Sequence, residues 1–271
     1  MTQANTPATN SPLFINSIDK DPVVFIKSFF ETNNEESLAW GLRALGIKAV
    51  AFDMDGTLVD TEDFCIENIV RVVNSELSSP LTNEEILSMP IGQRTLPILR
   101  TLLGSRGIAE EYLQEIKKKI TASYQAGLKE AIHKGQINSF PKPISLVKAL
   151  RNQDFSLSIV TSNTKARADQ QVEKNSLSDH FEFIISKESV DESKDPNAKS
   201  KPDPFVYKEA IKSFNCKSSE LLVIEDSNSG IEAATAAGAM VVAIRNKINQ
   251  QAISLKNLAL EQVYMLDLTS L

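Results

Sequence analysis

Short apolar runs alternate with amphipathic segments along the chain from residue 47 onward. Six runs rich in β-branched residues have the length of buried strands: Ile47–Asp53, Phe155–Thr161, Phe181–Ile185, Leu221–Glu225, Ala239–Ile244 and Val263–Leu268. Apolar residues at helical spacing between them predict helices at Ile144–Arg151, Lys165–Asn175, Pro204–Phe214, Ser229–Ala237 and Asn249–Leu258. This alternation is typical of a mostly parallel sheet covered on both faces, so the predicted fold class is α/β.

One stretch interrupts the alternation. Between about Thr61 and Ser139 only helical patterns occur, and no strand is expected there. The sequence Thr82-Asn83-Glu84-Glu85 predicts a capping box that opens a short helix. A long helix should follow, because apolar residues recur every four positions at Ile108, Tyr112, Ile116, Ile120, Tyr124 and Leu128. We therefore expect a helical module at residues 63–140, inserted between the two parts of an α/β core at 47–62 and 141–271.

The first 46 residues lie outside this pattern. Residues 1–20 are rich in Thr, Asn, Ser and Pro and predict a disordered leader, without the apolar core of a signal peptide or the arginines of a transit peptide. Asp21–Phe30 and Asn34–Leu45 predict two short helices. Packing on the core, which would bury Trp40, is the favoured interpretation of these helices. A dimer contact or a partner site would fit the same pattern.

The composition narrows the class of protein. The 271 residues can bury a sizeable core, and 24% charged with 42% hydrophobic residues is ordinary for a globular protein. A net charge of −6 does not favour binding to nucleic acid or to an anionic membrane. No apolar stretch reaches the length of a transmembrane helix. We expect a cytoplasmic protein with neither a nucleic-acid nor a membrane partner, and the oligomeric state stays open.

The candidate chemistry begins with the sequence DMDGTLVD, Asp53 to Asp60, which directly follows the first predicted strand. Residues two apart on an extended chain point the same way, so Asp53 and Asp55 should face one site at the strand's carboxyl end. Open α/β sheets bind ligands at this edge. One carboxylate could attack a substrate while the other handles protons, and both could help to hold a divalent cation. An isolated Asp-x-Asp would more simply be a solvated strand end, but the full sequence is much rarer.

Three later segments carry polar groups that suit phosphate and Mg²⁺. Thr161 and Ser162 end a strand at a helix start, where a hydroxyl, amides and the helix dipole favour a phosphate oxygen, although an ordinary helix cap would look the same. Lys201 begins the sequence KPDP, whose prolines would hold its ammonium in place for a phosphate, unless it is a surface lysine. Glu225 and Asp226 end another apolar strand and could complete an oxygen shell around Mg²⁺.

These four segments resemble, in their order along the chain, the four motifs of the haloacid dehalogenase (HAD) superfamily. The sequence is most similar to the branch of β-phosphoglucomutase-like proteins and sugar-phosphate phosphatases. The resemblance covers about Ile47 to the C-terminus, and VIEDSNSGIEAATAAGA is especially similar to the fourth motif. It implies a Rossmann-like core with an α-helical cap domain inserted after the first motif.

The resemblance also implies a role for each motif residue. Asp53 would be the nucleophile that forms an aspartyl-phosphate, and Asp55 would protonate the leaving oxygen and then activate water. Thr161, Lys201 and the amide of Ser162 would bind the phosphate. Mg²⁺ would be bound by Asp53, the carbonyl of Asp55 and Asp226. Glu225 would be a further Mg²⁺ ligand or would lie next to one.

The predicted activity is therefore Mg²⁺-dependent hydrolysis of a small phosphomonoester, such as a sugar phosphate. A helical module directly after the acidic motif favours a lid that admits small phosphorylated metabolites. Arg94, in the sequence Ile91-Gly92-Gln93-Arg94, could bind the leaving group, although a surface arginine fits equally.

Two alternatives remain. A phosphosugar mutase of the β-phosphoglucomutase type would carry a histidine where this sequence has Cys65, which weighs against that activity. A non-catalytic HAD-like binding protein would place its specificity in the N-terminal helices. The presence of every expected catalytic residue type weighs against this second alternative.

Overall fold

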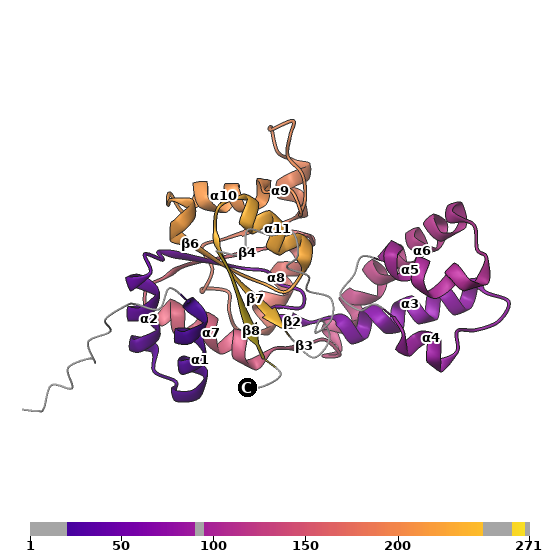
Figure 1. Cartoon of the computed structure of the whole chain (residues 1–271), viewed down its shortest axis with the longest axis horizontal. Coiled ribbons are helices and arrows are strands. Elements are labelled where there is room, and N and C mark those ends of the chain that lie inside the picture. Colours follow the sequence, from indigo (N-terminus) through magenta and orange to yellow (C-terminus); the bar gives the residue numbers. More distant parts are fainter. Residues whose placement is uncertain (1–20, 90–94, 246–261, 269–271) are drawn as a thin grey trace, which may run out of the picture.

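A six-stranded parallel sheet forms the centre of the protein. The structure, a computed structural model, describes residues 21–89, 95–245 and 262–268 (Figure 1). The strand order is β5-β4-β1-β6-β7-β8. All six predicted strands are present, within a few residues of their expected bounds: β1 Ala49–Phe52, β4 Ser156–Val160, β5 Phe183–Ile185, β6 Leu221–Glu225, β7 Met240–Arg245 and β8 Val263–Asp267. The predicted helix at Asn249–Leu258 lies outside the described residues.

Helices cover both faces of the sheet, as the apolar strands require. Successive strand residues point to opposite faces, so Val50 and Phe52 of β1 join one core while Ala49 and Ala51 join the other. The first core also contains side chains of α1 (Pro22–Thr32), α2 (Glu35–Ala44), α7 (Pro141–Asn152) and α8 (Lys165–Lys174). The second contains side chains of α10 (Phe205–Ser213) and α11 (Asn228–Ala236). This arrangement confirms the predicted α/β fold.

The two N-terminal helices pack on the first core. The side chains of Asp21 and Asn34 cap α1 and α2, because each accepts a hydrogen bond from a backbone amide of the first turn. Ile26 and Leu42 are completely buried beside the sheet. The prediction of buried packing was wrong for Trp40, whose exposed fraction is 49% and whose ring meets Phe25 edge-on. An amphipathic helix buries one stripe only, and Trp40 lies on the face of α2 opposite to the buried Leu38 and Leu42.

The helices between the first and fourth strands have a core of their own. They are α3 (Glu62–Glu76), α4 (Asn83–Leu87), α5 (Thr95–Leu103), the short 3₁₀ turn η1 (Gly104–Arg106) and α6 (Glu110–His133). Figure 1 shows this group beside the sheet rather than on either face of it. The capping box of Thr82 and Glu85 is present as predicted. Ile116 and Ile120 lie in the separate core, whereas Leu128 packs with the sheet, so the predicted stripe of α6 spans both.

A small ribbon joins the helical group to the sheet, contrary to the expectation that residues 61–139 hold no strand. Val59–Asp60 (β2) pairs antiparallel with Asn138–Ser139 (β3), so the outgoing and returning chain segments are hydrogen-bonded to each other. Strands of two residues are too short to show an alternating pattern, which explains the error. The helix α9 (Lys187–Asp191) and the 3₁₀ turn η2 (Ser218–Glu220) complete the elements of the described residues.

None of the helices in the described ranges is both long and apolar enough to cross a bilayer.

Candidate active site

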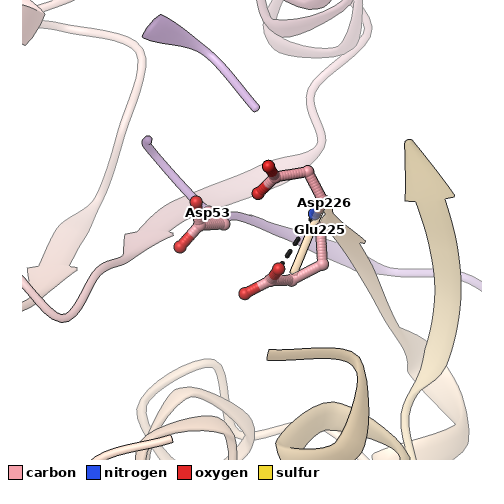
Figure 2. Close-up of side chains that lie close together, drawn as sticks. All are labelled: Asp53, Glu225 and Asp226. Carbon is pink, nitrogen blue, oxygen red and sulfur yellow. Dashed lines mark hydrogen bonds between the residues drawn. The ribbon is translucent and has the colours of Figure 1, made fainter. Parts of the chain in front are cut away.

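Three carboxylates meet where two central strands end. Asp53 directly follows β1, and its amide donates to the carbonyl of Ile224 in the neighbouring strand β6 over 2.9 Å. Glu225 is the last residue of β6, and Asp226 follows it. The three side chains each offer an oxygen within 4.8 Å of the others (Figure 2). The predicted convergence of these strand ends thus produces a compact acidic cluster.

Lys201 lies between two of these carboxylates. Its Nζ donates to Asp53 Oδ1 over 2.7 Å, to Glu225 Oε1 over 2.8 Å and to the carbonyl of Val160 over 2.8 Å. The side chain is only 4% exposed, and Nζ lies 5.2 Å from the centre of the Tyr207 ring. Lys201 is therefore a buried charge partner of the cluster and not a surface lysine.

Glu225 is fixed through both of its carboxylate oxygens. In addition to Lys201, Oε1 accepts a hydrogen bond from the Tyr207 hydroxyl over 3.3 Å. Oε2 accepts from the amides of Asp226 and Ser227, over 2.9 and 2.8 Å, and from the Ser227 hydroxyl over 3.0 Å. A Cβ at Gly230 would lie only 1.5 Å from Oε1, so α11 reaches this carboxylate because residue 230 is a glycine. These contacts make Glu225 a residue that positions its neighbours.

The electrostatics of the cluster follow from burial and charge. Burial raises the pKa of Asp53 to about 8; Glu225 and Asp55 add to the rise, and Lys201 acts against it. Burial acts to lower the pKa of Lys201, but Asp53 and Glu225 outweigh it and raise that pKa well above its usual value. Three carboxylates around one ammonium leave a surplus of negative charge. Such a set of oxygens suits a hard divalent cation.

The turn after β1 brings Asp226 close to the backbone. Gly56 has a φ of +83°, in the left-handed region that favours glycine, and a Cβ there would lie 1.9 Å from Asp226 Oδ2. The hydroxyl of Thr57 donates to Asp226 Oδ1 over 3.4 Å. The Gly-Thr pair of the motif therefore holds the backbone against the carboxylate of Asp226.

Asp55 has a different set of partners from Asp53. Its Oδ1 accepts a hydrogen bond from the Thr61 hydroxyl over 3.2 Å and pairs with Arg167, while its Oδ2 accepts from the side-chain amide of Asn163. No role was predicted for Asn163 or Arg167. The only sequence signal was their position just after the predicted strand that ends at Thr161.

The predicted phosphate-binding residues lie beside the cluster. Thr161 follows β4, the neighbour of β1, and is 3% exposed; its hydroxyl accepts a hydrogen bond from the Asn163 amide over 3.1 Å. Ser162 is exposed in the loop that leads into α8. Arg94, the predicted leaving-group residue, lies outside the described residues.

Comparison with known proteins identifies the family of this chain. Residues 50–244 match the family model described as haloacid dehalogenase-like hydrolase. The chain is 27% identical over 195 residues to a phosphorylated carbohydrates phosphatase of Thermotoga maritima, and the aligned region covers 71% of this chain and 82% of the relative. It is 28% identical over 202 residues to a phosphoglycolate phosphatase of Thiobacillus denitrificans, covering 74% and 84% of the two chains. A crystal structure of a HAD hydrolase of family IA, variant 3, from Entamoeba histolytica shares the fold, with a TM-score of 0.56, 22% identity and coverage of 81% and 92%.

Proposed function

The chain belongs to the haloacid dehalogenase-like hydrolase family, and we propose that it is a phosphatase that hydrolyses a small phosphomonoester with the help of Mg²⁺. One observation carries the proposal: the carboxylates of Asp53, Glu225 and Asp226 gather with the buried Lys201 at adjacent strand ends. The similarity to relatives named as phosphatases supports the same activity.

Asp53 would act as the nucleophile. Lys201 holds Oδ1, which orients the carboxylate so that an oxygen can attack the phosphorus. The bond from phosphorus to the leaving oxygen then breaks, and Asp55 gives that oxygen a proton. In the second half of the reaction Asp55 takes a proton from water, the water oxygen attacks the aspartyl-phosphate, and phosphate leaves with Asp53 restored.

The other residues would bind the phosphoryl group and the cation. Thr161, the amide of Ser162 and Lys201 would hold the phosphoryl oxygens. Asp53, Asp226 and the carbonyl of Asp55 would hold Mg²⁺, which supplies positive charge for the oxygens of the transferring group. Since both oxygens of Glu225 already accept hydrogen bonds within the protein, we assign Glu225 to positioning these groups.

We further propose that residues 63–140 form a cap over a core made of residues 47–62 and 141–271. The two-stranded ribbon of β2 and β3 would be its hinge, because both chain connections pass through it. Closure of such a cap excludes water and large substrates, which favours small phosphorylated metabolites.

Phosphate release from a panel of sugar phosphates, nucleotides and small phosphate esters tests this function. The assay compares wild type, Asp53→Asn and a control, Asp191→Asn, which changes an exposed carboxylate on α9. We expect Mg²⁺-dependent turnover that falls by at least about a thousandfold in Asp53→Asn and is unchanged in the control. Interconversion of hexose phosphates without phosphate release would indicate a mutase instead. The absence of either reaction would indicate a binding protein.

A further inference from the structure

Arg167 is a largely buried cation that the proposed reaction does not use. It lies in the first turn of α8, and only 10% of its side chain is exposed. Nη2 pairs with Asp55 and also donates to the Tyr124 hydroxyl over 3.1 Å, while Nη1 donates to Asn163 Oδ1 over 2.6 Å. The guanidinium carbon lies 5.3 Å from the centre of the Tyr124 ring. Since Tyr124 belongs to α6, this cation lies where the helical group meets the sheet.

One N–H group of this guanidinium donates no hydrogen bond within the described part of the chain. Arg167 Nε is buried, and no hydrogen-bond partner for it occurs among the described residues. Buried polar groups are nearly always paired, and an exception needs an explanation such as a ligand. Arginine is also the residue that best matches the planar fork of a carboxylate or the oxygens of a phosphate.

The position of Arg167 relative to the reaction follows from its contact with Asp55. In an in-line transfer the leaving group departs on the side opposite the nucleophile, Asp53, and Asp55 must reach the leaving oxygen. A substituent one or two atoms beyond that oxygen therefore comes within reach of a residue that touches Asp55. Arg167 is such a residue, and the Tyr124 hydroxyl lies beside it.

We propose that Arg167, together with Tyr124, recognises a negatively charged group on the leaving part of the substrate. The substrate class is then a phosphate ester or anhydride whose leaving group carries a carboxylate or a second phosphate, in preference to a phosphorylated carbohydrate with hydroxyl groups only. This inference rests on the proposed phosphatase function and names the substrate class of the same site. The alternative is that Arg167 only orients Asp55. In that case, substitution of Arg167 would slow the reaction of every substrate alike.

Matched substrate pairs separate these roles. In the first pair, 2-phosphoglycolate is compared with 2-hydroxyethyl phosphate, which replaces the carboxylate by a neutral group. In the second, pyrophosphate is compared with methyl phosphate, so that the two pairs distinguish a carboxylate from a second phosphate. Wild type, Arg167→Met, Arg167→Lys and a control, Lys165→Met, are assayed with Mg²⁺. Lys165 is an exposed cation on the same helix, paired with Asp169.

We expect wild type to prefer the charged member of at least one pair by ~10- to 100-fold in kcat/KM, mainly through a lower KM. Arg167→Met should bring this ratio close to one, Arg167→Lys should retain part of it, and Lys165→Met should leave it unchanged. Equal hydrolysis of both members of both pairs by wild type would overturn the inference. So would an Arg167→Met enzyme that still prefers the charged member.

Calorimetric binding decides the case in which Arg167→Met has no turnover. Asp53→Asn and Asp53→Asn/Arg167→Met are titrated with both members of each pair, after circular dichroism has shown that they are folded. Weaker binding of the charged ligand alone supports the inference, and equal weakening of both ligands overturns it. If wild type hydrolyses none of these four compounds but releases phosphate from sugar phosphates, the inference is overturned while the phosphatase function stands. If it also releases no phosphate from the wider panel, the phosphatase function fails, and the same titrations still test Arg167.

Discussion

The substitution Gly230→Ala tests whether the position of Glu225 holds the acidic cluster together. A Cβ at residue 230 would lie 1.5 Å from Glu225 Oε1, whereas ordinary contacts begin at 3.4 Å, so the carboxylate would have to retreat by about 2 Å. That movement exceeds what the hydrogen bonds to Lys201 and to the amides of Asp226 and Ser227 can absorb. The new methyl group would therefore separate Glu225 from its buried partners.

We expect Gly230→Ala to destabilise the protein strongly, although the intrinsic effect of replacing glycine by alanine in a helix is stabilising. Alanine in a helix is intrinsically more stable than glycine by about 1 kcal/mol. Breaking a buried charge pair typically costs about 3–5 kcal/mol. We therefore expect Gly230→Ala to lower the free energy of unfolding by about 3 kcal/mol and to weaken divalent-cation binding. The control is Gly104→Ala in η1, where a Cβ would meet no atom within 4 Å; its stability should equal that of wild type or exceed it slightly.

Urea unfolding followed by circular dichroism measures the first effect, and calorimetric titration with Mg²⁺ measures the second. If Gly230→Ala unfolds at the same urea concentration as Gly104→Ala and binds Mg²⁺ as wild type does, the reasoning is refuted. That outcome would show that the carboxylate of Glu225 can move freely, in spite of the hydrogen bonds at both of its oxygens.

Two further predictions concern the cation and the N-terminal helices. Burial raises the pKa of Asp53 to about 8, so below that pH a cation must displace the proton of this carboxyl group. The Mg²⁺ affinity measured by calorimetry should therefore rise from pH 6 to pH 8. The rise should be weaker in Asp53→Asn. A flat wild-type profile would contradict the assignment of Asp53 as a ligand. Leu42→Ala should lower the free energy of unfolding by about 2–5 kcal/mol because Leu42 is fully buried, whereas Val24→Ala, at a 45% exposed site, should change it by less than about 0.5 kcal/mol. A loss for Leu42→Ala as small as that for Val24→Ala would show that these helices do not stabilise the core.

The sequence predicted the strand ends well because their chemistry depends on topology alone. Apolar runs that alternate with helices predict parallel strands, and the carboxyl ends of adjacent parallel strands meet at one edge. Asp53, Glu225 and Asp226 come together for this reason. Lys201 is also predictable, because a rigid proline-containing segment follows it, but its three hydrogen-bond partners required coordinates.

The contacts of Asp55 could not be predicted in the same way. Alternation along a strand places Asp53 and Asp55 on the same side, yet Asp55 lies beyond the end of β1, where the backbone turns, and it pairs with Arg167 and Asn163. Arg167 lies in a strongly polar helix and looks like part of a solvated surface. Its burial depends on Tyr124, a residue 43 positions away on α6, and no local pattern carries that information.

The small residues of the second core connect the packing of the sheet to the chemistry at its edge. On the face covered by α11, β6 presents Leu221 and Val223 and β7 presents Val241 and Ala243, while the helix contributes Ile231, Ala233 and Ala234. The short side chains of the helix let it lie close to the strands, and its first turn arrives at the end of β6. Glycine is then the only residue type at position 230 that leaves room for the Glu225 carboxylate. The alanine-rich sequence after Asp226 therefore sets the distance at which Glu225, and through it Lys201 and Asp53, is held.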